Sequence, residues 1–255
     1  MDLHGIAANA GRTSLPGMDG EDRRMFFLQI AGWSVLEEIR KDESESRVND
    51  TVIVQPAIMA IQISLIKLYE HYSIKPEAVV GHSVGEVAAG FAAGALTLEQ
   101  AVQVIYHRSQ AQNQASGKGG MIAVGLSMEE AGKLIAPCEG CVSIGAVNGP
   151  KMLTLSEDTA PLQKIAAALE TRGVFCRPVR AQVAYHSHHM DSIKGVILEA
   201  LDEVHGVKAT IPLYSTVTGH GENGLHLNAE YWFLNARKPV RADSRFVGFK
   251  LRVLV

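Results

Sequence analysis

Cysteine is scarce in this sequence: only three of the 255 residues, Cys138, Cys141 and Cys176. An odd and sparse set excludes the disulfide framework of a small secreted domain and indicates a reducing compartment. Cys138 and Cys141 form a single CxxC pair, which supplies two ligands where a tetrahedral zinc site needs four. We therefore interpret this pair as two thiols in a turn.

Neither a large excess of one charge nor a secretory signal is present. Lys and Arg number 24 against 27 Asp and Glu, for a net charge of −3, so the basic face needed to bind nucleic acid is not indicated. Residues 1–20 are polar and Gly-rich and lack the apolar core of a secretory signal. The apolar stretch Met25–Leu36 is shorter than the ~20 residues of a membrane span. These absences predict a soluble, cytoplasmic protein without nucleic-acid or membrane contacts.

Apolar residues make up 47% of the chain, enough for a sizeable core. Capping boxes at Ser34, Thr97 and Ser127 predict three helix starts. Pro56, expected in the first turn of a further helix, precedes apolar residues at helical spacing. We expect residues 1–20 to form a disordered tail.

A potential nucleophile follows the short apolar segment Ala78–Val80, a predicted buried strand. The next five residues, Gly81–Gly85, read Gly-His-Ser-Val-Gly and open a helix of small residues. Gly-x-Ser-x-Gly between a strand and a helix is the nucleophile elbow of α/β hydrolases. It would expose Ser83 Oγ for attack, and the backbone N–H of Val84 would be one donor to an oxyanion.

Residues 120–180 have a different pattern, with predicted strands and helices in the order β-α-β-β-α-β. This is the ferredoxin-like order. The predicted fold class is therefore α/β: a hydrolase-like parallel-sheet core over residues 21–119 and 181–241, with an inserted ferredoxin-like subdomain.

A serine needs a base, and three histidines follow the predicted subdomain directly, in the segment Tyr185–Met190. His186, His188 and His189 could also suggest a metal site. No further ligand is spaced nearby, so we predict no metal. His82 adjoins Ser83, but its side chain is expected to point away from Oγ.

Arg108 shares a helix face with the apolar residues Val104 and Ile105. A buried arginine stays charged and requires an anionic partner. That partner could be a protein carboxylate or the carboxylate of a substrate, and the spacing favours neither.

Four segments together resemble the malonyl/acyl-CoA:acyl-carrier-protein transacylases, above all the acyltransferase domains of polyketide and fatty acid synthases. They are GHSVGEVAAG at 81–90, VIYHRSQ at 104–110, AVNGP at 146–150 and AYHSHHM at 184–190. The resemblance covers residues 30–241. It implies that Ser83 is the nucleophile, His186 its base and Arg108 the group that grips a malonyl carboxylate. It also implies that a backbone carbonyl near Asn235, in an N-x-x-x-P-V motif, orients the histidine.

The same resemblance implies the substrates and partners. The acyl donor would be acyl-CoA and the acceptor the phosphopantetheine thiol of an acyl carrier protein, with no bound cofactor. A ketosynthase and other synthase domains could adjoin. Ala184 and Tyr185, just before His186, are similar to the malonyl-selective type, although Val183 departs from it.

The chain also departs from the family at its ends. Nothing in residues 1–30 resembles the Gly-Gln-Gly-like loop that gives these enzymes a second oxyanion donor, and residues 242–255 form an atypical tail. We therefore expect a domain truncated at both ends. Two alternatives stay open: a serine hydrolase or editing thioesterase with Asp158 as third triad member, and a catalytically incompetent fragment.

Overall fold

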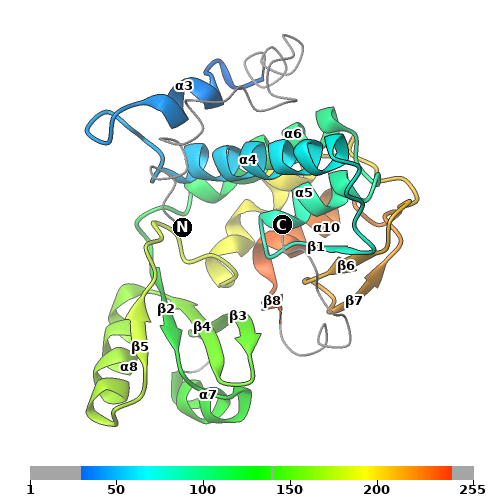
Figure 1. The fold of residues 1–255 in the computed structure, drawn as a ribbon. Helices are drawn as coiled ribbons and strands as arrows, with labels where there is room; N and C mark the ends of the chain where they lie inside the picture. The colour runs from blue at the N-terminus through cyan, green and yellow to red at the C-terminus, as the bar shows by residue number, and fades with distance from the viewer. Residues whose placement is uncertain (1–29, 139–140, 243–255) are drawn as a thin grey trace.

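The computed structural model describes residues 30–138 and 141–242, in which helices and strands are mixed, so the predicted α/β class is confirmed (Figure 1). The tail expected at 1–20 lies outside the described residues, as does that at 242–255 apart from Ala242. The elements in chain order are α3 (Val35–Arg40), α4 (Thr51–His71), β1 (Val79–Val80), α5 (Gly85–Ala92), α6 (Leu98–Asn113), β2 (Gly120–Val124), α7 (Met128–Ile135), η1 (Ala136–Cys138), β3 (Ser143–Gly149), β4 (Met152–Glu157), α8 (Thr159–Thr171), β5 (Cys176–Pro178), η2 (His188–Ile193), α9 (Lys194–Ala200), β6 (Leu213–Ser215), β7 (His220–Glu222), α10 (Ala229–Arg237) and β8 (Val240–Arg241).

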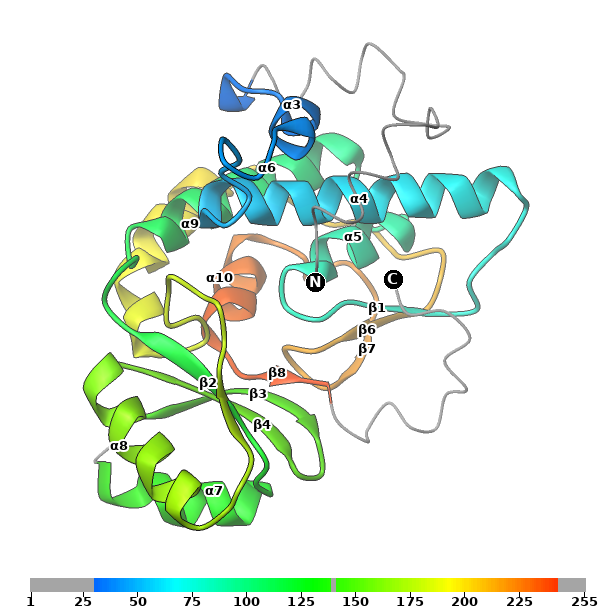
Figure 2. The same ribbon diagram turned by 60° about the vertical axis from the view of Figure 1, so that its left-hand side comes forward.

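Helices α4, α5 and α6 pack against one another, as Figure 2 shows from a second side. The predicted capping box at Thr97 is complete, because its side chain accepts from the backbone of Gln100 and the Gln100 side chain accepts from the backbone of Thr97. The placement of Pro56 was wrong: α4 begins at Thr51, so the proline lies in the second turn. Pro56 is buried there, although its missing N–H leaves one helical hydrogen bond unmade.

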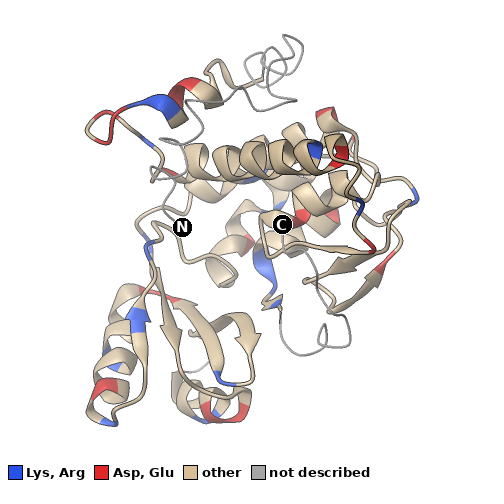
Figure 3. Ribbon diagram, viewed as in Figure 1, with Lys and Arg blue, Asp and Glu red and all other residues tan. Residues whose placement is uncertain are grey.

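By length and composition alone, α4 could cross a membrane. Half of its apolar window is nevertheless buried inside the fold, against α5 and α6. Its two charged residues, Lys67 and Glu70, form an ion pair near its end, and Figure 3 shows the remainder of the helix free of charge. These features are those of a core helix.

A three-stranded sheet in the order β1-β6-β7 lies below these helices. Strands β1 and β6 are parallel and β6 and β7 antiparallel. A hydrolase-like parallel sheet was predicted, but among the described residues this sheet contains a single parallel pair. This parallel pairing with β6 positions β1, and the turn to α5 starts at the end of β1.

A second sheet has the order β5-β2-β4-β3-β8. Its first four strands, with α7 and α8, follow one another along the chain as β-α-β-β-α-β, the ferredoxin-like pattern. Leu162, Ile165 and Leu169 of α8 pack against Leu153 and Leu155 of β4 in a core separate from that of the helical part. The predicted capping box at Ser127 begins α7.

Strand β8 was not predicted, and it joins the two parts of the molecule. It follows α10 and pairs in parallel with β3, with Val240 opposite Ala146. The segment after α10 thus reaches the edge of the second sheet. On this path the Lys238 carbonyl comes next to His186.

Candidate active site

Ser83 occupies a strained turn between β1 and α5. Its φ of 53° lies in the left-handed region, which costs a residue with a Cβ about 1–3 kcal/mol. Gly81 permits the turn, because a Cβ there would lie 2.2 Å from the backbone carbonyl of Gly85. This is the strand–turn–helix geometry that the Gly-x-Ser-x-Gly motif requires.

His186 reaches Ser83 from the segment before η2. Its Nε2 lies 2.9 Å from Ser83 Oγ, and its Nδ1 lies 2.8 Å from the carbonyl oxygen of Lys238. Because a carbonyl can only accept, Nδ1 carries the hydrogen and Nε2 presents a lone pair to the serine hydroxyl. Burial, and secondly the charge of Arg108, lowers the pKa of His186 to about 3. The imidazole is therefore a neutral acceptor at physiological pH.

The backbone carbonyl that orients His186 lies within the predicted N-x-x-x-P-V motif, but it belongs to Lys238 and not to Asn235 itself. Helix α10 ends at Arg237, so the Lys238 carbonyl lies beyond the helical hydrogen-bond ladder and can turn toward the imidazole. Asn235 is still in the site through its side chain. Its Nδ2 donates to the Ser83 carbonyl at 3.1 Å, which fixes the strained turn.

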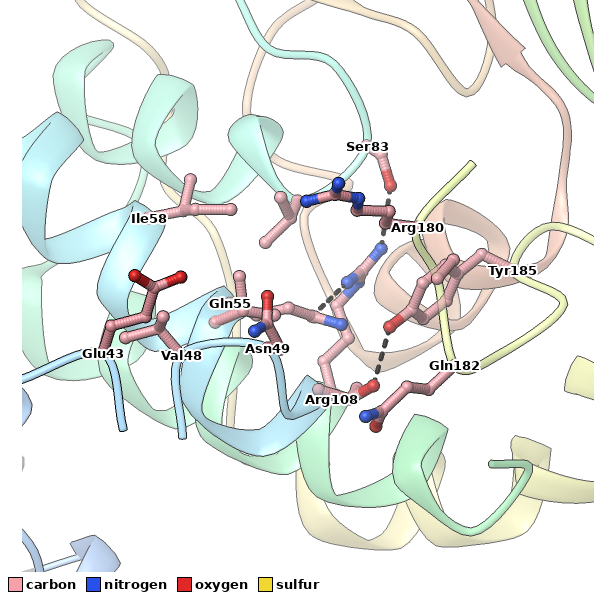
Figure 4. A pocket seen from close by; sticks show the side chains of 14 residues that line it. Glu43, Val48, Asn49, Gln55, Ile58, Ser83, Arg108, Arg180, Gln182 and Tyr185 are labelled. Atoms are coloured by element: carbon pink, nitrogen blue, oxygen red, sulfur yellow. Dashed lines mark hydrogen bonds between the residues drawn. The ribbon is translucent and has the colours of Figure 1, made fainter. Parts of the chain in front are cut away.

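The guanidinium of Arg108 lies in the same cluster, 1% exposed. Its Nη2 donates to Ser83 Oγ at 3.1 Å and its Nε donates to Asn235 Oδ1 at 3.0 Å. Its Nη1 donates to Gln55 Oε1 at 2.6 Å (Figure 4). The same nitrogen also donates to Gln112 Oε1 at 3.0 Å. Burial lowers the pKa of Arg108 to about 10, so the group stays charged at neutral pH.

All four of these contacts are with neutral oxygens. No carboxylate within the described residues forms an ion pair with Arg108. A buried cation without a counter-ion is costly, and a partner that supplies a carboxylate removes that cost. The site is therefore prepared for an anionic ligand beside the serine.

A cavity of about 780 Å³ opens onto this cluster (Figure 4). Ser83, Val84, Arg108 and Tyr185 line it, and the Tyr185 hydroxyl lies 2.8 Å from Thr51 Oγ1. Val84, the predicted oxyanion donor, is the residue before the first turn of α5. A ligand in this cavity would touch both the serine and the arginine.

Ala184, predicted to contact substrate, is not among the described residues that line the cavity. It is 1% exposed, and its carbonyl accepts from Ser187 Oγ at 2.6 Å. Its small side chain lies in the packed interior next to Tyr185. His82, as predicted, turns away from the serine: its Nε2 lies 2.9 Å from Asn148 Oδ1.

Asp158, the third triad member of the hydrolase alternative, is not placed for that role. Its Oδ1 lies 2.9 Å from His189 Nε2, while the Nδ1 of His186 is occupied by a backbone carbonyl. The order of residues along a chain does not determine which histidine an aspartate meets.

Gln55 and Gln112, which hold Arg108, were missed by sequence analysis. Gln112 follows Arg108 by four residues on α6, so helical spacing could have identified it. Gln55 comes from α4, and its only signal is an uncharged polar residue within an apolar helix. Its Nε2 donates to Gln112 Oε1 at 2.8 Å, which completes the cradle around the guanidinium.

The chain matches a known protein family and several known proteins. The model of the acyl transferase domain family matches residues 22–247. The chain is 39% identical over 231 residues to the highly reducing polyketide synthase PKS2 of Leptosphaeria maculans, covering 84% of this chain and 9% of that protein. It is 37% identical over 216 residues to the erythronolide synthase EryA3 of Saccharopolyspora erythraea, covering 85% of this chain and 7% of that protein. The chain thus spans less than a tenth of either relative.

Solved structures have the same fold. The acyltransferase domain from module 8 of the salinomycin polyketide synthase has a TM-score of 0.83 and 30% identity, over 94% of this chain and 54% of that one. The malonyl-CoA:ACP transacylase of Synechocystis has a TM-score of 0.77 and 25% identity, over 92% of this chain and 77% of that one. The family match covers most of the chain, and it includes the turn at Ser83 and the segment with His186. The chain belongs to the acyl transferase domain family.

Proposed function

We propose that this chain moves a malonyl-type acyl group from coenzyme A to the phosphopantetheine thiol of an acyl carrier protein, through an ester on Ser83. The observation that carries the proposal is Arg108: a buried, charged guanidinium with neutral partners, 3.1 Å from the serine oxygen. A malonyl group has a free carboxylate beside its thioester. It could therefore satisfy the arginine while presenting its carbonyl carbon to Ser83.

In the first half-reaction, His186 Nε2 takes the proton of Ser83 Oγ as the oxygen attacks the thioester carbonyl carbon. The Val84 N–H would stabilise the negative oxygen of the tetrahedral intermediate. The C–S bond then breaks, and the proton on Nε2 passes to the coenzyme A sulfur. The Lys238 carbonyl holds the imidazole in the tautomer that this step requires.

In the second half-reaction, His186 accepts the proton of the carrier thiol, whose sulfur attacks the Ser83 ester. The C–O bond breaks and the proton returns to Oγ, which regenerates the serine. These steps use side chains, backbone groups and two thiols, so the proposal includes no bound cofactor or metal in the chemistry. The acyl carrier protein is the proposed partner, with neighbouring synthase domains, in a soluble cytoplasmic enzyme.

The test is intact-mass analysis after mixing with malonyl-CoA, followed by peptide mapping. Ser83 should gain one malonyl group and Ser83→Ala none, and added carrier protein should remove the group to its own thiol. A label on another residue would refute the nucleophile. A Ser83 ester that is hydrolysed and not transferred to the carrier protein would support the hydrolase alternative. A folded chain that gains no malonyl group would support a catalytically incompetent fragment.

A further inference from the structure

A second cluster of ionisable side chains lies outside the serine site, where the small sheet meets the segment after His186. Glu157 is the last residue of β4, and His188 and His189 begin η2. One potential ligand atom from each of the three lies within 4.8 Å of the others. The two imidazole rings lie 4.2 Å apart, tilted by 32°. Nothing in the proposed acyl transfer uses these residues.

The Glu157 carboxylate is buried and incompletely satisfied. Its side chain is 0% exposed, and its Oε1 accepts from the backbone N–H of Asp158 at 2.8 Å. Its Oε2 has no hydrogen-bond partner within the described part of the chain. A buried carboxyl group with an unpaired oxygen is rare in a protein interior, and an ion that is bound there is one of its few explanations.

The imidazole nitrogens face this carboxylate at spacings that suit a shared ion. His188 Nδ1 lies 3.5 Å from Glu157 Oε2, and His189 Nε2 lies 3.8 Å from Oε1. Metal–ligand bonds of about 2.0–2.2 Å in a tetrahedron place neighbouring ligand atoms roughly 3.4 Å apart. The two separations, one to each carboxylate oxygen, are close to this edge length.

Asp158 adds a second carboxylate beside His189, next to the cluster of three. Its Oδ1 lies 2.9 Å from His189 Nε2, a contact whose alignment does not satisfy a hydrogen bond. The side chain of His188 is 45% exposed, which leaves an entry path for an ion. Two carboxylates and two imidazoles are a ligand set that suits zinc and related transition metals better than magnesium or calcium, which prefer oxygen alone.

We propose that Glu157, His188 and His189, with Asp158 as fourth ligand, bind one divalent transition-metal ion, for which Zn²⁺ is the probe. The site would link the end of β4 to η2, and so fasten the ferredoxin-like sheet to the segment that carries His186. An ion that binds the folded chain and not the unfolded one stabilises the fold by mass action. Binding should therefore be visible in the melting temperature without any assay of acyl transfer.

The test uses a Cys138→Ser/Cys141→Ser background, because the two free thiols of this CxxC pair could also bind zinc. Calorimetric titration with Zn²⁺ should give one equivalent of tight binding and a higher melting temperature. Co²⁺ in the unmutated site should give the visible absorption of a tetrahedral ion with nitrogen and oxygen ligands. This spectrum does not depend on whether any substitution folds.

Glu157→Gln and His189→Gln should each weaken Zn²⁺ binding by at least about tenfold and abolish the melting shift. Matched controls are Glu170→Gln, an exposed glutamate on α8, and His226→Ala, an exposed histidine after β7, which should both bind as the parent does. No stoichiometric binding, or equal affinity in Glu157→Gln, would overturn the proposal. The cluster would then be a set of polar contacts around the buried carboxyl group and not a metal site.

Discussion

Replacing Arg108 by alanine should change which acyl group is loaded, and not merely how fast. The guanidinium has five N–H donors, and four of them are used: one by Asn235, one each by Gln55 and Gln112, and one by Ser83. The fifth, on Nη2, is on the same nitrogen that contacts the serine oxygen. A malonyl carboxylate bound there would be close to the reacting ester, whereas an acetyl group has nothing to bind it.

The magnitude follows from the number of bonds. A hydrogen bond to a charged group contributes about 1.5–3 kcal/mol, or roughly 10–150-fold in rate for each bond. The free N–H of Nη2 supplies one such bond. The other N–H of Nη2 supplies a second if the carboxylate displaces its contact with Ser83 Oγ. We therefore expect the malonyl-to-acetyl loading ratio of Arg108→Ala to fall by at least about tenfold.

The assay is parallel loading of malonyl-CoA and acetyl-CoA by the parent and the variant, read by intact mass. Arg108→Ala also leaves the Gln55 and Asn235 oxygens without the donor that Arg108 supplies, and leaves Gln112 Oε1 with the Gln55 amide alone, so its stability should fall. The ratio of the two substrates cancels any loss of folded protein, because both are loaded by the same active fraction. Melting curves would measure that loss separately.

Two matched variants sharpen the result. Arg108→Lys keeps the charge but loses the planar fork, so its ratio should lie between those of the parent and the alanine variant. Arg180→Ala removes an exposed arginine from the rim of the same cavity and should slow both substrates alike. An unchanged ratio in Arg108→Ala would refute the reasoning and remove the arginine from substrate recognition.

Three further results are expected. His186→Ala should slow loading by about 10²–10⁴-fold, whereas exposed His226→Ala should not, and equal losses would contradict a specific base. Because burial lowers the pKa of His186 to about 3, loading should show no histidine ionisation between about pH 5 and pH 8, and a titration near 6.5 would contradict this assignment. Burial raises the pKa of Glu86, in α5, from 4.5 to about 7. The contribution of its protonated carboxyl group to the stability of the fold is therefore complete below pH 4.5 and is lost as the pH rises through 7. Chemical unfolding should show this loss, about 3 kcal/mol, in the parent and not in Glu86→Gln, and identical pH profiles would count against it.

Local features were predictable because short stretches of chain determine them. The turn at Ser83 depends on five consecutive residues, and the helix starts at Thr97 and Ser127 depend on residues three apart. The alternation of strands and helices over residues 120–180 likewise identified the ferredoxin-like order. In the turn and the helix starts, the hydrogen bonds and the steric contacts join residues that are at most a few positions apart. The local sequence is therefore sufficient to predict these features.

Contacts between distant segments were decided only by the tertiary structure. Arg108 meets Gln55 across 53 residues and Asn235 across 127, and neither amide differs in sequence from one exposed to solvent. The Lys238 carbonyl has no side-chain signature, so the motif at Asn235 indicated the segment that orients His186 but not the residue. Glu157 meets His188 and His189 because β4 ends beside η2, and packing of two separate parts of the fold determines that approach. The sequence by itself determined the nucleophile's turn, whereas packing determined which neutral and charged groups surround it.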